Sequence, residues 1–347
     1  MRRALSQRAL SFFQALPPYA GGKRRLVPAI FGLIDSICPR ASWPGLIFSD
    51  AFMGGCSVAL TAKALGFGRV VANDLATRSV IVGRALLENS TATLTPLDVL
   101  QLFQASAAGC SRNGDLLERL PAPLAEFLAS AWTHVQSCPP PKDDLARLLL
   151  IRWVLSFFPM GLPSATDSWR VRDRDFDHIS YRRLDHYLLR EKQLVHPRYL
   201  LRLAAKINAA VFPGRASVTR SDALAFLPGI EADIAYLDPP YGGTQSYERA
   251  FRFLDEFLGD QHGEISSFSS ARPPLDELLA ACDHIPVLVL SMNNAVFTEQ
   301  ELTALVARHR RVERVISMPY KHYGPLASTR KNKANREMLV LGTKGSE

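Results

Sequence analysis

The apolar positions of this 347-residue chain fall into short continuous runs that alternate with stretches of helical spacing. Near the start, the runs at 46–50 and 69–72 predict two strands, and residues 58–65 between them predict a helix. Gly66 and Gly68 can end that helix. The order of strand, glycine turn, helix and strand is typical of a βαβ unit.

The last part of the chain repeats this alternation. Its expected elements are a helix at 199–210, strands at 217–219, 232–237 and 286–290, and a closing antiparallel hairpin of 312–316 with 338–341. Strands that alternate with helices predict an α/β fold with a mostly parallel sheet.

The middle of the chain interrupts this progression. We expect helices around 97–107, 115–136 and 142–158, broken at Pro139-Pro140-Pro141, and then a loop at 159–187 rich in Arg, Asp and Tyr. The chain therefore divides into a first part at 1–88, a largely helical insertion at 89–195 and a second part at 196–347.

The run at 232–237 ends in Asp238-Pro239-Pro240-Tyr241. Two prolines cannot continue a central strand, and ligands of open α/β sheets bind at the carboxyl ends of strands. Asp238 and the Pro239 carbonyl can each accept a hydrogen from an exocyclic amine, and Tyr241 can stack on a planar base. Taken alone, the tetrapeptide fits an ordinary proline-rich turn equally well.

Two earlier segments bear on that choice. A glycine turn, Phe52-Met53-Gly54-Gly55-Cys56, follows the first strand, and Asp74 lies about 20 residues beyond it, where an acidic residue can bind ribose hydroxyls. The turn lacks the full dinucleotide glycine pattern, which favours a single nucleoside as the ligand.

The segment Tyr19-Ala20-Gly21-Gly22-Lys23 lets the backbone approach a ligand and offers an ammonium group to a carboxylate. Alone, this segment is better explained as a flexible basic loop.

Taken in order, these motifs resemble those of the D12 class of DNA adenine-N6 methyltransferases, the family of the Dam enzymes. The resemblance extends to 221–226 and 330–340, and leaves roughly 89–194 unmatched. One departure is Cys56, which stands where the family has the second glycine of the loop. We interpret Cys56 as a packing residue.

The resemblance implies a Rossmann-like methyltransferase fold with a mostly parallel sheet, a closing antiparallel hairpin and a target-recognition insertion. It implies S-adenosylmethionine as methyl donor and no metal. Tyr19 and Lys23 would meet the methionine end of this cofactor and Asp74 the ribose. Asp222 would accept from its adenine amine, or serve only as a helix cap. The expected cofactor residues are Tyr19, Ala20, Gly21, Gly22, Lys23, Asp50, Phe52, Gly54, Gly55, Ser57, Asp74 and Asp222.

Composition fits a globular chain that acts on a polyanion. Hydrophobic residues make up 47% and charged residues 21%, and the formal net charge is +8. No apolar stretch is long enough to cross a membrane; the best, 145–160, contains two arginines. Five scattered cysteines argue against a disulfide framework or a zinc site, and fit a reducing cytoplasm in a bacterial or phage-infected cell.

We expect double-stranded DNA as the partner, since Lys and Arg neutralise phosphates. A solvated basic face is the alternative explanation of these charges. A monomer and an association with a cognate restriction enzyme both remain open. The candidate DNA-binding residues are Arg170, Arg172, Arg174, Arg182, Arg183, Lys321, Arg330, Lys331, Lys333 and Arg336.

The predicted reaction is methylation of adenine N6 in a nucleotide that is flipped out of the duplex. Asp238, Pro239, Pro240 and Tyr241 form the candidate catalytic motif. Two alternatives stay open: an RNA guanine-N2 methyltransferase, and a catalytically silent DNA-binding protein that retains the fold. The recognised DNA sequence cannot be deduced from these motifs.

Overall fold

The structure is a computed structural model. It describes residues 11–19, 22–104, 122–157, 195–240, 247–260, 266–270, 273–320 and 335–345.

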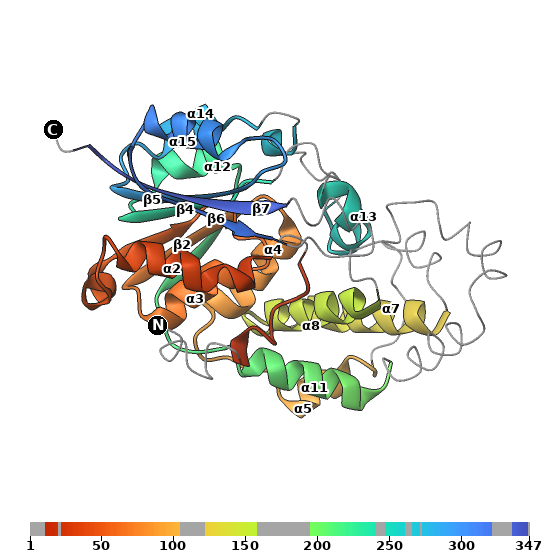
Figure 1. The fold of residues 1–347 in the computed structure, drawn as a ribbon. Helices are drawn as coiled ribbons and strands as arrows, with labels where there is room; N and C mark the ends of the chain where they lie inside the picture. Colours follow the sequence, from red (N-terminus) through yellow and green to blue (C-terminus); the bar gives the residue numbers. More distant parts are fainter. Residues whose placement is uncertain are drawn as a thin grey trace, which may run out of the picture.

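A seven-stranded sheet forms the centre of the described part of the chain (Figure 1). Its strands are β1 Ile47–Asp50, β2 Arg69–Asp74, β3 Ala216–Arg220, β4 Ile234–Leu237, β5 Val287–Asn293, β6 Arg311–Pro319 and β7 Arg336–Thr343. The order across the sheet is β3-β2-β1-β4-β5-β7-β6. The pairs from β3 to β5 are parallel, and β7 is antiparallel to both β5 and β6.

This order confirms the predicted Rossmann-like methyltransferase fold and its closing antiparallel hairpin. The direction of winding reverses between β1 and β4, which lie side by side with Asp50 paired to Tyr236. In an open α/β sheet, ligands bind beyond the strand ends at such a reversal. The residues that follow β1 and β4 therefore border the expected site.

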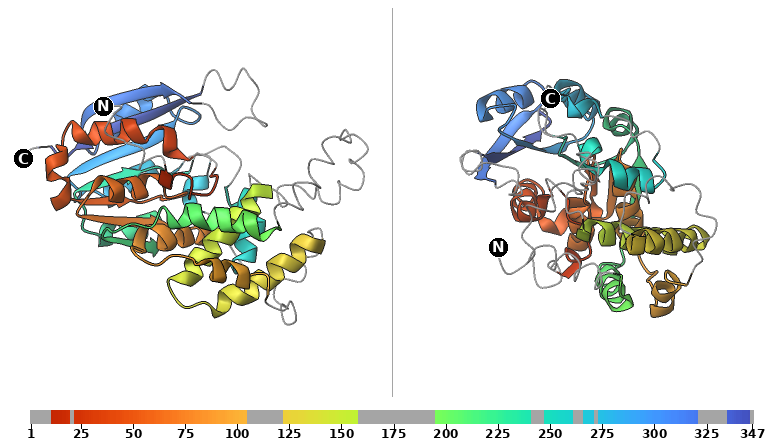
Figure 2. Two further views of the ribbon diagram at one scale, coloured as in Figure 1. Left: turned by 90° about the horizontal axis from the view of Figure 1, so that it is seen from below. Right: turned by 90° about the vertical axis from the view of Figure 1, so that its right-hand side faces the viewer.

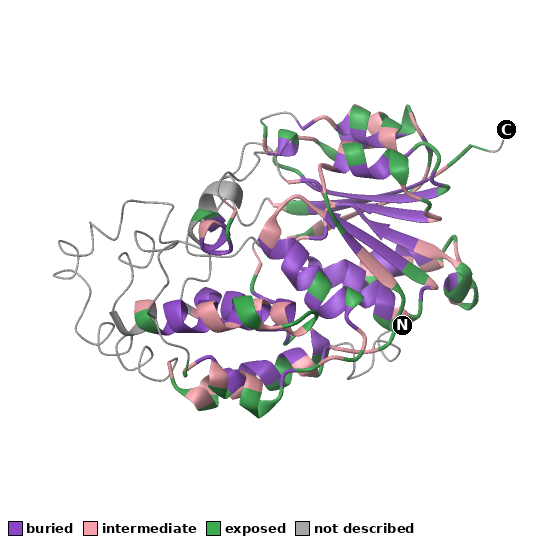
Figure 3. Ribbon diagram, turned by 180° about the vertical axis from the view of Figure 1, so that it is seen from behind, coloured by how far each residue is buried: buried purple, intermediate pink, exposed green. Residues whose placement is uncertain are grey.

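Helices cover both faces of the sheet. In Figure 1, α12, α14 and α15 lie on one face, and α2, α3, α4 and α8 lie on the other. Successive residues of β4 alternate between the two cores: Ile234 and Tyr236 join one, and Ala235 and Leu237 join the other. A strand buried on both faces has this continuous apolar character, and every residue of β4 and β5 is buried, in agreement with the purple central strands of Figure 3.

The helices predicted at 58–65, 142–158 and 199–210 begin and end within two residues of those limits. The described helices are α2 Val27–Asp35, α3 Ser57–Leu65, α4 Thr77–Gly83, α5 Pro96–Gln101, α7 Ala122–Ser137, α8 Lys142–Phe157, α11 Pro197–Asn208, α12 Ala223–Phe226, α13 Tyr247–Phe257, α14 Leu275–Ala281 and α15 Glu299–Ala307. Gly66 ends α3 in the left-handed conformation, with φ +86°, as expected.

The helix predicted at 97–107 ends early. Thr95 and Asp98 form a capping box at the start of α5, and the helix stops at Gln101. Residues 102–104 continue as tighter turns, in which each amide donates to the carbonyl three residues before it. Residues 105–107 lie outside the described part.

Helices α5, α7, α8 and α11 gather on one side of the molecule (Figure 2). Trp153 of α8 is buried, and it belongs to the same core as strand residues such as Phe48 of β1. Helix α8 therefore packs into the same core as that face of the sheet. Among the described residues, no helix has the length and apolar character needed to cross a membrane.

Candidate active site

Three carboxylates lie where neighbouring parallel strands end. Asp50 closes β1, Asp74 closes β2, and Asp238 directly follows β4. Asp50 is buried, and its Oδ2 accepts a hydrogen bond from the Ala59 amide at 3.1 Å. Burial raises the pKa of Asp50 well above its ordinary value, and the nearby charge of Asp238 raises it further. The strand ends thus bring three carboxyl groups together at the sheet reversal.

The glycine turn is tied to the end of β2. The Gly54 amide donates to Asp74 Oδ2 at 2.7 Å, and the Ala76 amide donates to Asp74 Oδ1 at 2.9 Å. Gly54 has φ +49°, which favours glycine. A Cβ on Gly55 would lie 2.9 Å from Cβ of Tyr19. The two glycines therefore allow the Tyr19 segment to lie directly against the turn.

Cys56 adopts the left-handed conformation, with φ 63°. This geometry explains why a glycine suits the position in related enzymes. The Cys56 thiol is fully buried, and burial raises its pKa, so it stays protonated. The structure fits the interpretation of Cys56 as a packing residue and gives no support for a nucleophile.

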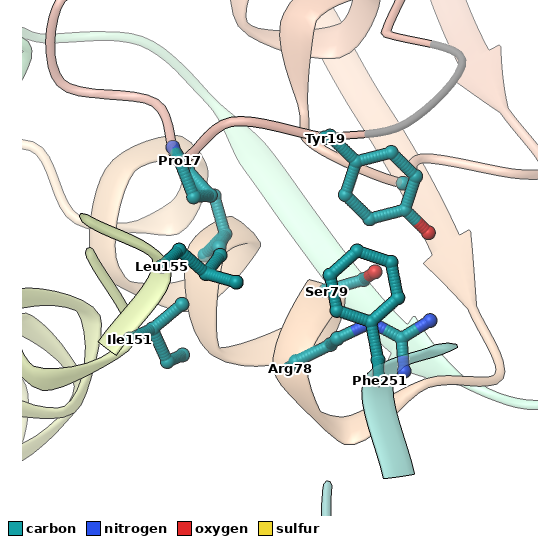
Figure 4. A pocket seen from close by; sticks show the side chains of 9 residues that line it. Pro17, Tyr19, Arg78, Ser79, Ile151, Leu155 and Phe251 are labelled. Atoms are coloured by element: carbon teal, nitrogen blue, oxygen red, sulfur yellow. The ribbon is translucent and has the colours of Figure 1, made fainter. Parts of the chain in front are cut away.

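An aromatic stack lines one side of the site (Figure 4). The Tyr19 ring lies nearly parallel to the Phe251 ring, with centroids 5.7 Å apart, and the Arg78 guanidinium lies 4.3 Å from the Phe251 centroid. Ile151 and Leu155 of α8 line the small apolar pocket beside these rings. Helix α8 thus contributes to the wall of this pocket.

Arg78 also forms a buried ion pair with Asp255 of α13. This pair connects the start of α4 to the helix that follows the Asp-Pro-Pro-Tyr motif in the chain. The pKa of Asp255 is raised to about 6. Burial has the largest effect and raises this pKa, while the positive charge of Arg78 lowers it. Sequence analysis did not identify Arg78, Phe251 or Asp255, because nothing in their local sequence distinguishes them from ordinary helix residues.

Lys23 joins Asp238 to a residue that sequence analysis also missed. The Lys23 ammonium lies 3.0 Å from Asp238 Oδ1 and 3.0 Å from Oε1 of Glu337 on β7. Ser291 of β5 donates a hydrogen bond to Glu337 Oε1 at 2.7 Å. The Lys23 side chain is 4% exposed. Lys23, expected at the cofactor carboxylate, is therefore placed in contact with the candidate catalytic aspartate.

Other expected cofactor residues lie around the same strand ends. Asp222 caps α12, because its Oδ1 accepts from the Leu224 amide at 2.8 Å, so one of its two proposed roles is observed. Phe52 packs edge-on against Phe268, with centroids 5.0 Å apart. Ser57 is the first residue of α3 and is buried.

Several expected residues lie outside the described part of the chain. They are Ala20, Gly21, Tyr241, Arg170, Arg172, Arg174, Arg182, Arg183, Lys321, Arg330, Lys331 and Lys333. Arg336 is described: it is exposed, and its Nε donates to Ser317 Oγ at 2.6 Å.

Comparison with known proteins agrees with this site. Residues 19–106 match the family model for D12 class N6 adenine-specific DNA methyltransferases. This match confirms the resemblance to the D12 class. The matched region contains the Tyr19 segment, the glycine turn and Asp74, and it supports DNA adenine methylation as the general activity.

One relative similar to this chain is the type II methyltransferase M2.HphI of Haemophilus parahaemolyticus. It is 26% identical over 345 residues, which cover 93% of this chain and 96% of the relative. A solved structure from Listeria monocytogenes, described as a class I S-adenosylmethionine-dependent methyltransferase, covers 78% of this chain and 88% of its own, with 12% identity and a TM-score of 0.27. The fold assignment rests on the strand order.

Proposed function

We propose that this protein is a site-specific DNA methyltransferase that transfers a methyl group from S-adenosylmethionine to N6 of an adenine flipped out of double-stranded DNA. One observation carries the proposal above all others. The Asp238 carboxylate follows β4 at the reversal of the sheet, and the Lys23 ammonium lies 3.0 Å from it.

The residues present fit the proposed cofactor. Asp50 Oδ1 is buried without a hydrogen-bond partner among the described residues, so it can accept from an amino group. Asp74 would bind the ribose hydroxyls, and Gly54 and Gly55 bring the Tyr19 segment directly against the turn. Tyr19 would form one wall of the site. S-adenosylmethionine supplies the methyl group when it is bound.

The chain's own groups would orient the target base. Asp238 and the carbonyl of Pro239 each accept one hydrogen of the exocyclic amine, which directs the nitrogen lone pair toward the methyl donor. Tyr241 would stack on the base. Extruding a nucleotide costs a few kcal/mol, and these contacts would offset that cost. Because the site fixes the direction of the amine, positioning would provide much of the rate.

We assign recognition of DNA to the insertion at 89–195 and to the basic residues of the loops. Basic side chains neutralise phosphates without reading sequence, so the positive charge supports DNA binding but no particular target. A type II relative fits a role in restriction and modification, with a cognate restriction enzyme as a further partner.

Transfer of a labelled methyl group tests this function. The purified protein would be incubated with labelled S-adenosylmethionine and unmethylated duplex DNA, and the nucleosides would be separated after digestion. We expect label in N6-methyladenine, and loss of at least 100-fold of the rate in Asp238→Ala, since a positioned catalytic group contributes about that much. Label in N2-methylguanine of RNA, or no cofactor binding by calorimetry, would overturn the proposal.

A further inference from the structure

Glu337 is a buried acidic residue near the start of β7. It lies on β7, which is inserted between β5 and β6, and its register partners are Asn293 and Met318. Its side chain has no exposed surface. An unpaired carboxylate would be very costly there, so the contacts of Glu337 indicate why the residue is tolerated.

The contacts of Glu337 connect it, through Lys23, to Asp238 of the candidate catalytic motif. Lys23 Nζ lies 3.0 Å from Glu337 Oε1 and 3.0 Å from Asp238 Oδ1. An ammonium has three donors, so one lysine can serve both carboxylates at once. Ser291 donates to the same Glu337 oxygen at 2.7 Å, which fixes that carboxylate from β5. The Lys23 ammonium thus links Glu337 to Asp238.

We infer that Glu337 is a positioning residue for methyl transfer, which acts through Lys23 to fix the orientation of the Asp238 carboxylate and the pH range in which that carboxylate is ionised. This inference rests on the proposed function, because the proposed function gives Asp238 its role as the acceptor of the amine. Glu337 itself contacts neither Asp238 nor the substrate in this account.

The charges around Asp238 determine in which direction each substitution should shift its pKa. Burial raises the pKa of Asp238 to about 7; Lys23 lowers it, the charge of Glu337 raises it, and the nearby Ser291 hydroxyl lowers it. Three further titratable groups face this cluster. Asp50 lies on β1, Tyr236 lies on β4, and Tyr320 follows β6 with its ring centroid 5.8 Å from Lys23 Nζ.

Two substitutions should therefore move the pKa of Asp238 in opposite directions. Glu337→Gln removes a negative charge while it keeps an oxygen that can accept from Lys23, so the pKa of Asp238 should fall. Ser291→Ala keeps both carboxylates but removes a donor, so the pKa should rise. A residue that only fills space would not produce this pair of shifts.

The test titrates the protein without cofactor or DNA. Carboxyl carbons of aspartate would be followed by NMR, and the Asp238 signal would be identified by its loss in Asp238→Asn. Glu313→Gln is the matched control, because Glu313 is a glutamate on the neighbouring strand β6, paired with Arg311 and remote from this cluster in its contacts. We expect Glu337→Gln to lower the Asp238 midpoint by about one pH unit, a size that fits two charges a few ångströms apart.

Activity provides the second readout. In Glu337→Gln, the acidic limb of the pH dependence of kcat should move to lower pH by the same amount as the titration midpoint of Asp238. The value of kcat should fall several-fold, with little change in KM. Ser291→Ala should move the limb to higher pH and Glu313→Gln should leave it in place. If Glu337→Gln does not fold, the shift in Ser291→Ala still tests the inference.

The outcomes separate this inference from the proposed function. Shifts of opposite sign in a protein that methylates no DNA would support the buried network and reject the proposed function. A wild-type protein that methylates adenine, combined with an Asp238 midpoint that neither variant moves beyond Glu313→Gln, would overturn the role of Glu337.

Discussion

The Lys23 ammonium and the Asp238 carboxylate form a buried ion pair at 3.0 Å. This contact joins the amino-terminal glycine segment to the motif after β4, although most of the chain separates them. The pair connects the wall of the cofactor site to the group proposed to hold the target amine. Loss of either partner should therefore affect more than local stability.

Lys23→Met tests the dependence of Asp238 on this pair. Lys23 lowers the pKa of Asp238, so its removal should raise that pKa above about 7 and leave more of the carboxyl protonated at neutral pH. We expect a loss of 10-fold or more in single-turnover rate at pH 7, with partial recovery toward pH 9. Lys142→Met, which removes a partly exposed lysine paired with Asp98, is the control and should keep the wild-type pH profile. An equal loss at every pH would argue against this electrostatic link.

Gly55→Ala tests the close approach of the Tyr19 segment. The added Cβ would lie 2.9 Å from Cβ of Tyr19, so the backbone must shift. Overpacking of this kind costs about 1–3 kcal/mol, and the shift should weaken binding of S-adenosylmethionine about 10-fold or more. Gly45→Ala adds the same methyl group where no atom lies within 4 Å. Calorimetry on both variants would check the prediction, and equal affinities would contradict it.

Cysteine alkylation tests the environment of Cys56. Its thiol is fully buried and protonated because burial raises its pKa, whereas Cys38 and Cys138 are partly exposed. Mass spectrometry after brief treatment of the native protein with iodoacetamide should therefore find Cys38 and Cys138 modified before Cys56. Rapid modification of Cys56 would show that the glycine turn is open to solvent.

Cys56→Gly tests the strain at the same residue. Glycine removes the cost of a left-handed backbone, about 1–2 kcal/mol, but it also removes the buried side chain. These effects oppose each other, so urea unfolding should show a change of no more than about 1 kcal/mol, with methylation retained. Cys56→Val should be clearly destabilised, because a branched side chain is poorly tolerated at φ 63°. A Cys56→Gly protein without activity would point to a direct role for the thiol.

Asp238→Asn should make the protein more stable at alkaline pH. The folded pKa of Asp238, raised to about 7, exceeds the unfolded value of about 3.9. The stability that this group contributes is complete below about pH 4 and is lost as pH rises through 7. Asparagine cannot ionise, so urea unfolding should give nearly equal stabilities near pH 4 and an advantage of roughly 2–4 kcal/mol for the variant at pH 8. A variant that is less stable at pH 8 would contradict this sign.

The sequence predicted those features that depend only on residues close to one another in the chain. The βαβ unit, the glycine turn and the carboxylate after β4 follow from apolar runs, glycine positions and prolines, and the structure confirms their placement. The segments at 312–316 and 338–341 also pair as the expected hairpin. Helix α5 ends earlier than predicted because its last residues tighten into turns.

Other features depend on which strands become neighbours. Glu337 precedes an apolar run. Its proposed role depends on the position of β7 between β5 and β6, which brings Glu337 within hydrogen-bond distance of Ser291 and Lys23. The stack of Phe251 on Tyr19 likewise depends on how α13 packs. Helical spacing shows that such residues face inward, but it does not identify their partners.

The most direct test of the proposed function is methylation-sensitive long-read sequencing of DNA from cells that express the wild-type protein or Asp238→Ala. We predict N6-methyladenine at one recurring sequence in the wild-type sample and background levels in the variant sample. Equal adenine methylation in both samples, or no adenine methylation with the wild-type protein, would contradict the account.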